Sequence, residues 1–108
     1  MNIVVINENN NRILEIHGDV DASSSIDVDQ QIRLAIDEKV QHILIDCTSL
    51  EYISSAGLGV FMSYLQELKS IDTEMTLYNM SDKVFKVFEI LGLHNLIKIV
   101  ATKEDALS

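Results

Sequence analysis

The sequence predicts a single α/β domain, residues 1–108, in which helices cover a mixed, mostly parallel sheet. Three observations predict it: the chain opens with two short β-favouring runs, a continuous apolar run stands at Ile43-Leu44-Ile45, and strand-like and helix-like segments alternate along the chain. A chain of 108 residues, 47% of them apolar, is long enough to bury one core, and no linker-like stretch divides it.

The opening runs are residues 2–7 and 11–17, separated by Glu8-Asn9-Asn10. Because Asn tolerates a positive φ, this spacing predicts an antiparallel hairpin. Residues 18–22, Gly-Asp-Val-Asp-Ala, are expected to break the second strand.

Two amphipathic helices are indicated by apolar residues at steps of three and four. The first begins at one of the serines 23–25, which are good N-caps, and runs to about Lys39. The second follows the apolar run at 43–45. The apolar faces comprise Val28, Ile32, Ala35 and Ile36 in the first helix, and Leu58, Phe61, Met62, Leu65 and Leu68 in the second.

The apolar run at 43–45, extended by Cys47, suits a central strand that is buried on both faces. Strands are also predicted over 74–79 and 97–100. Between these two strands, Ser81 or Asp82 caps a short helix that Gly92 ends, and Thr102 begins a final helical turn. The predicted order is therefore ββαβαβαβ, followed by a short helix.

The charge balance argues against several partners. Eight basic and seventeen acidic residues give a net charge of −9, and no Lys/Arg cluster exists to bind phosphate. We therefore expect neither a nucleic-acid nor a membrane partner. The single cysteine permits no intrachain disulfide, and the four-residue apolar run near the N-terminus is too short for a signal peptide. A cytoplasmic location follows as an expectation.

The segment from Asp46 to Gly59 carries the most functional information, because it joins a buried strand to the clearest helix. Functional groups gather at such junctions in open α/β sheets. Ser54 and Ser55 stand at or just before the predicted helix start, and Gly57 and Gly59 fall in its first turn. A glycine in a helix interior costs about 1 kcal/mol relative to alanine, so two glycines in one turn need a reason. We expect that their missing side chains leave this end of the helix sterically open to a partner.

A hydroxyl group at this place has two interpretations. It can cap the helix by accepting a backbone N–H. If Ser55 has this role, Ser55→Ala is expected to remove a helix cap. Alternatively, it accepts a phosphoryl group, because the positive end of a helix dipole accommodates an anion. The residue types alone leave both open.

The run Ile53-Ser54-Ser55-Ala56-Gly57-Leu58-Gly59, preceded by Ile43-Leu44-Ile45-Asp46, resembles the signature of STAS-domain anti-sigma factor antagonists. A second match lies upstream, where Gly18-Asp19-Val20-Asp21 resembles the Gly-Glu-Leu-Asp element of that family. The order of elements and the length also fit a STAS-like fold. The resemblance covers nearly the whole chain, and the two motifs together make it specific.

The resemblance implies a non-catalytic protein-binding switch without cofactor or metal. Ser55 takes the phosphoserine position, Asp21 takes the acidic position near it, and the implied partner-binding residues are Asp21, Ser54, Ser55, Ala56, Gly57 and Gly59. The implied partners are an anti-sigma factor with histidine-kinase-like serine kinase activity, bound when Ser55 is unphosphorylated, and a PP2C-type phosphatase. The family commonly has Asp where this chain has Ser54, which leaves Ser54 as an alternative phosphorylation site.

Other interpretations remain beside this one. Asp21 could simply cap the first helix or bind amides of its own loop. The domain could also serve as a STAS docking module in another phospho-signalling or transport-associated complex without a sigma factor. Asp46 ends a buried strand, as in a response-regulator receiver, but a chain that opens with two strands disagrees with that fold. The three histidines show no ligand-like spacing, so we predict no metal site.

Overall fold

A computed structural model describes all residues from 1 to 108, and it confirms the predicted fold class. Its elements in chain order are β1 (Asn2–Glu8), β2 (Asn11–Val20), α1 (Ser25–Asp37), β3 (His42–Asp46), β4 (Leu50–Ile53), α2 (Ser55–Ser63), α3 (Leu65–Ser70), β5 (Glu74–Tyr78), α4 (Asp82–Ile90), the 3-10 turn η1 (Leu93–Asn95), β6 (Lys98–Val100) and α5 (Lys103–Leu107).

The sheet has the order β1-β2-β3-β5-β6, and β4 pairs only with β2. The β1–β2 pair is antiparallel and every other pair is parallel. The predicted hairpin turn is formed by Asn9 and Asn10, whose φ angles of 51° and 68° lie in the left-handed region. No helix is both long and apolar enough to cross a membrane.

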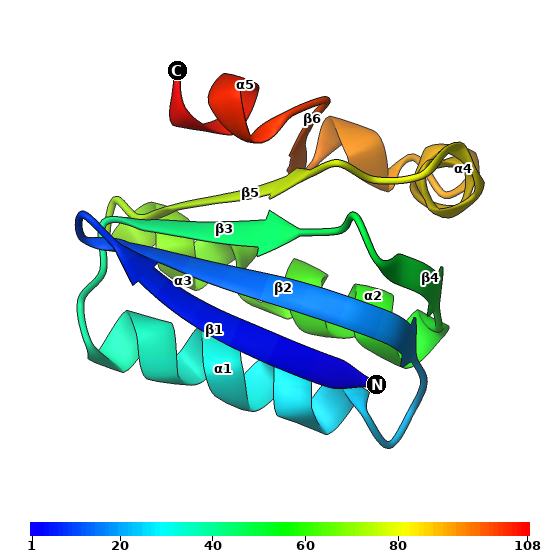
Figure 1. Cartoon of the computed structure of the whole chain (residues 1–108), viewed down its shortest axis with the longest axis horizontal. Helices are drawn as coiled ribbons and strands as arrows, with labels where there is room; N and C mark the ends of the chain where they lie inside the picture. Colours follow the sequence, from blue (N-terminus) through cyan, green and yellow to red (C-terminus); the bar gives the residue numbers. More distant parts are fainter.

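The two faces of the sheet are covered unequally (Figure 1). Helices α1, α2 and α3 lie against one face, where the main core forms, while α5 lies on the other side. There Ala106 packs in a small cluster with Ile13, Leu44 and Tyr78. The prediction of a central strand buried on both faces is confirmed, because Leu44 belongs to this small cluster and Ile43 and Ile45 to the main core. Burial raises the pKa of the Cys47 thiol to about 12, so it acts as a small core residue.

The prediction that the second strand breaks at Gly18 is wrong, because β2 continues to Val20. Gly18 adopts a φ of 94°, and the register shifts between Gly18 and Asp19. Gly18 pairs with Leu50 and Asp19 with Tyr52, so the extra residue is Glu51 on β4, and β2 continues without an inserted residue. From Gly18 to Val20, β2 pairs with β4, a strand that was not predicted from the sequence.

The single helix expected between β4 and β5 is divided into α2 and α3 at Tyr64. The hydroxyl of Ser63 donates to the carbonyl of Val60 at 2.7 Å, which is the carbonyl that the Tyr64 N–H would use in a continuous helix. The Tyr64 N–H instead reaches Phe61 O at 3.4 Å, a 3-10-type contact. Back-bonding by a serine hydroxyl is a known cause of helix bending and accounts for the break.

The predicted caps of the C-terminal half are confirmed. Ser81 accepts the Val84 N–H at 3.2 Å at the start of α4, and Thr102 accepts the Asp105 N–H at 3.1 Å at the start of α5. Gly92 follows α4 with a φ of 72°, the left-handed conformation expected after a helix.

Candidate functional site

The two sequence motifs meet where β2 and β4 end side by side. Val20 and Ile53 are paired in parallel register, and the Ser54 N–H donates to Val20 O at 2.8 Å. Asp21 directly follows the first of these strands, and the serine pair follows the second. The fold therefore brings the Asp21 loop and the start of α2 to the same edge.

Ser54, not Ser55, caps α2. Ser54 has extended backbone angles, φ −83° and ψ 170°, and its Oγ accepts the Gly57 N–H at 3.2 Å. Ser55 is the first residue of the helix, and its side chain makes no hydrogen bond within the chain. The expectation that Ser55→Ala removes a cap is thus wrong, because the helix begins one residue earlier than that role requires.

The Ser55 side of the helix start faces solvent. Ser55, Ala56 and Gly59 are exposed, whereas Ser54 is half-buried. The first turn of α2 contains no acidic residue, so the positive end of the helix dipole is not neutralised locally. The site can therefore receive an anionic group without displacing a carboxylate from the same turn.

The two glycines differ in function, although the sequence suggested one explanation for both. Gly59 has open space where a side chain would stand, as expected. Gly57 is buried, and a Cβ there would lie 2.8 Å from Cγ1 of both Ile53 and Val20. Its absent side chain therefore lets α2 pack closely on the ends of β2 and β4, and the expectation of an opening toward a partner fails at this position.

Asp21 organises its own loop, and the interpretation of Asp21 as a residue that binds loop amides is confirmed. Its Oδ1 accepts the backbone N–H of Ser24 at 2.8 Å and the hydroxyls of Ser23 and Ser24 at 3.0 and 2.9 Å. The backbone N–H of Asp21 in turn donates to the Ser24 hydroxyl at 2.9 Å. These bonds, the Ser24 N–H first, lower the pKa of the Asp21 carboxyl below its ordinary value of 3.8.

A shallow hollow of about 680 Å³ lies beside this edge, between β4 and the start of α4. Its wall includes Tyr52, which is 49% exposed, together with Glu51 and Lys83. Tyr52 was not among the residues predicted for the site, because β4 was not predicted from the sequence. The alternation of β4, with Leu50 and Ile53 inward and Glu51 and Tyr52 outward, places the tyrosine on the surface.

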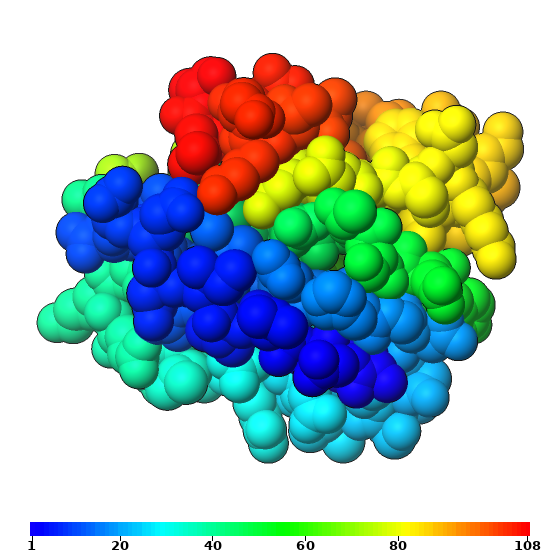
Figure 2. All heavy atoms as spheres, viewed as in Figure 1, coloured from blue at the N-terminus to red at the C-terminus, as the bar shows by residue number.

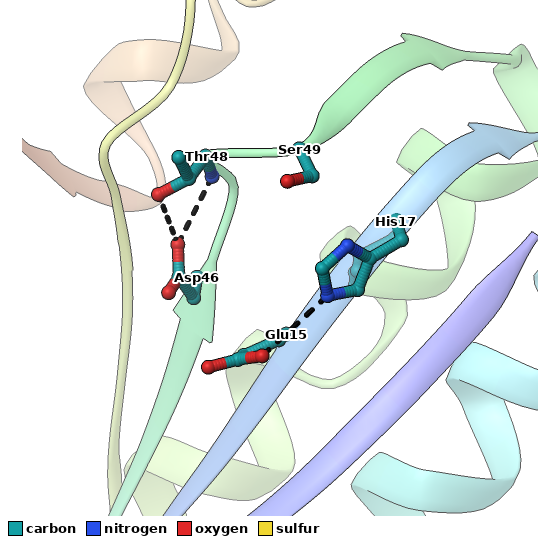
Figure 3. A pocket seen from close by; sticks show the side chains of 6 residues that line it. Glu15, His17, Asp46, Thr48 and Ser49 are labelled. Atoms are coloured by element: carbon teal, nitrogen blue, oxygen red, sulfur yellow. Dashed lines mark hydrogen bonds and ion pairs between the residues drawn. The ribbon is translucent and has the colours of Figure 1, made fainter.

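A separate polar pocket of about 210 Å³ lies between the middle of β2 and the end of β3 (Figure 3). Asp46 Oδ1 accepts the backbone N–H and the hydroxyl of Thr48 at 3.0 and 2.6 Å, and His17 Nε2 lies 3.4 Å from Glu15 Oε1. Asp46 therefore stabilises the turn after β3. The element order opens with a hairpin, which disagrees with the receiver interpretation of this residue.

A family model described as the STAS domain matches residues 2–106. The chain belongs to the STAS domain family. The anti-sigma-B factor antagonist of Listeria monocytogenes is 32% identical to this STAS protein over 84 residues, which are 78% of this chain and 74% of that protein. The predicted resemblance to STAS-domain anti-sigma factor antagonists is confirmed.

Solved structures share the fold of this STAS protein. An anti-sigma factor antagonist from Mycobacterium paratuberculosis has a TM-score of 0.87 at 17% identity, covering 98% of this chain and 90% of that one. The anti-sigma factor antagonist SpoIIAA in its unphosphorylated form has a TM-score of 0.76 at 21% identity, covering 98% and 94%. The phosphorylated form of SpoIIAA, described as a Bacillus cell fate determinant, has 0.73 at 22% identity, covering 98% and 96%.

Proposed function

We propose that this STAS protein is a cytoplasmic anti-sigma factor antagonist controlled by phosphorylation of Ser55. Its single domain, residues 1–108, binds an anti-sigma factor with histidine-kinase-like serine kinase activity when Ser55 is unphosphorylated, and releases it after phosphorylation. A PP2C-type phosphatase restores the binding form. The name of the Listeria relative and the phosphorylated form of SpoIIAA support this proposal. We propose no catalytic role for the protein itself.

The observation that carries the proposal is the exposed Ser55 hydroxyl at the start of a helix that Ser54 already caps. A phosphoryl group adds about −1.5 to −2 charges, and the positive end of α2 offsets part of that charge. Phosphorylation at Ser55 therefore removes no hydrogen bond that holds the helix. Ser54 is the poorer acceptor, because its oxygen is engaged with Gly57 and the residue is half-buried.

The partner-binding surface in this proposal is made by Ser54, Ser55, Ala56 and Gly59 on α2 and by the loop that Asp21 holds. Asp21 contributes by fixing the shape of that loop, because its carboxylate is already engaged by Ser23 and Ser24. Gly57 is buried below this surface, and its missing side chain sets the distance between α2 and the strands. A phosphate on Ser55 then acts by adding bulk and charge to the binding surface itself.

Mass spectrometry of the protein purified from its native host tests the proposal. We expect one phosphate on Ser55, kept in Ser54→Ala and lost in Ser55→Ala. In a pull-down, Ser55→Ala should retain the kinase, whereas Ser55→Asp should lose it. Two unmodified serines under every growth condition, or a Ser55→Asp protein that binds as tightly as the wild type, would contradict the switch.

The second candidate is a STAS docking module in another phospho-signalling or transport-associated complex. It is favoured by Ser54, which replaces the acidic residue that the family resemblance leads one to expect at this position. The two functions differ in what is recovered with the protein. A sigma factor released from the captured kinase supports the antagonist, while a stable complex without kinase or sigma factor supports the docking module.

A further inference from the structure

Strand β1 forms one edge of the sheet, and its outer side has no partner strand. All seven of its residues pair with β2 in unbroken register, from Asn2 opposite His17 to Glu8 opposite Asn11. In an antiparallel ladder, alternate residues direct their N–H and C=O groups to opposite sides, so half of the β1 groups point away from β2. Figure 2 shows the β1 atoms, in dark blue, uncovered across one face of the molecule.

This edge lacks the features by which proteins protect exposed strands. β1 contains no Pro, Lys or Arg, its register shows no bulge, and its single charge, Glu8, stands at its end. Its centre is apolar and exposed, with Val4 and Val5 at 38% and 40%. The opposite edge differs, because β6 has three residues and begins with the charged Lys98.

We propose that β1 pairs antiparallel with β1 of a second copy of this chain, which joins two sheets into one. A register centred on Val5 uses all seven residues, placing Val5 opposite Val5, Val4 opposite Ile6 and Asn2 opposite Glu8. The two-fold axis passes between the two Val5 residues, perpendicular to the sheet, so side chains on one face of the first sheet continue on the same face of the second. No like charges stand opposite one another, and the apolar centre of each strand covers that of the other.

The net charge of the chain opposes self-association, and β1 is a segment where few charges add to that repulsion. Two copies with a net charge of −9 each repel one another, and β1 offers an approach along a strand with one carboxylate. A seven-residue strand is about 24 Å long, so the interface is at the small end of the usual range and the dimer should be reversible. Salt should strengthen the dimer by screening the repulsion. The proposal does not rest on the function proposed for Ser55.

Cross-linking tests the register. In a Val5→Cys variant, the two introduced thiols would face one another across the two-fold axis, at a Cα separation that a disulfide bridges. We expect a covalent dimer on mild oxidation, and none from the control Ile90→Cys, whose residue is 72% exposed on α4. The natural Cys47 is buried and does not interfere. Equal cross-linking of both variants would overturn the proposed register.

Analytical ultracentrifugation over a dilution series tests the dimer itself. We expect a monomer–dimer equilibrium that shifts toward dimer with added salt, and Val5→Lys should raise its dissociation constant by about tenfold or more, because like charges then face across the axis. Ile90→Lys should leave it unchanged. Circular dichroism checks that both variants fold. A wild type that stays monomeric at the highest concentration in high salt, or a dimer indifferent to Val5→Lys, overturns the proposal.

Discussion

The Ser54 hydroxyl accepts the backbone N–H of Gly57 at 3.2 Å, so the residue that caps α2 directly precedes the exposed Ser55. Two adjacent hydroxyls therefore stand in different environments, one bonded to the helix and one open to solvent. Substitutions can separate the stability of the helix start from any binding that takes place on its surface.

Ser54→Ala should lower the free energy of unfolding by about 1 kcal/mol, because it removes the cap. Ser55→Ala should change it by less than about 0.5 kcal/mol, as is usual for exposed positions. Urea denaturation of the two variants beside the wild type measures both. A larger loss from Ser55→Ala than from Ser54→Ala would show that the helix begins at a different residue.

Ser55→Asp should leave the fold at least as stable as the wild type. A carboxylate in the first turn interacts favourably with the helix dipole, by about 0.3 to 1 kcal/mol at low salt. Thermal unfolding at low and high salt checks this, and the gain should shrink as salt rises. Marked destabilisation would mean that loss of partner binding by this variant reflects misfolding.

Gly57→Ala should destabilise the protein by about 1 to 2 kcal/mol, because the new Cβ collides with buried side chains of Ile53 and Val20. The matched control is Gly59→Ala in the same helix, where nothing lies within 4 Å. There the better helix propensity of Ala should stabilise by up to about 1 kcal/mol. Opposite signs in denaturation experiments support the packing role, while equal effects speak against it.

Ser63→Ala should join α2 and α3 into one continuous helix. Without the serine hydroxyl, Val60 O becomes available to the Tyr64 N–H, and the helix should gain about 0.5 kcal/mol from the propensity of Ala. Amide hydrogen exchange of Tyr64, followed by NMR, should slow relative to the wild type. An unchanged Tyr64 exchange rate would assign the break to another cause.

Asp21 should contribute stability that depends on pH. Its folded pKa lies below the ordinary 3.8, so the unfolded chain takes up the proton more readily. The contribution is therefore present above about pH 4 and is lost as the pH falls through the lowered folded value. Asp21→Asn should be less stable than the wild type at neutral pH, and the difference should narrow in acid. Urea midpoints of both proteins at several pH values measure it, and a constant difference would contradict the assignment.

The order of elements could be predicted because most elements carry local signals. Asn9 and Asn10 mark the hairpin turn, Ser81 and Thr102 mark helix starts, and the apolar spacing marks the helix faces. Strand β4 could not be predicted in this way, because its four residues are held by pairing with the end of β2. Gly18 lies inside β2 with a φ of 94°, and a Gly that ends a strand looks the same in sequence as a Gly within one.

The location of the candidate site could be predicted from the sequence, whereas the roles of its individual residues could not. The resemblance identified the two motifs, and the structure places both at one edge. Which serine caps α2 depends on the helix start to within one residue, a precision that propensities do not reach. The reason for Gly57 lies in contacts with Val20 and Ile53, which come from different strands and cannot be recognised by spacing along the chain.

Strand β2 changes partners at Gly18: the part before it pairs with β1 and β3, and the part from Gly18 to Val20 pairs with β4. The two parts should therefore accept insertions and deletions very differently during evolution. Extra residues between Glu8 and Asn11 lengthen a surface turn and leave the rest of the fold in place. One residue added between His17 and Val20 would instead shift Val20 against Ile53 and separate the Asp21 loop from α2. Length variation among relatives should accordingly concentrate at the hairpin turn and avoid the segment from His17 to Val20.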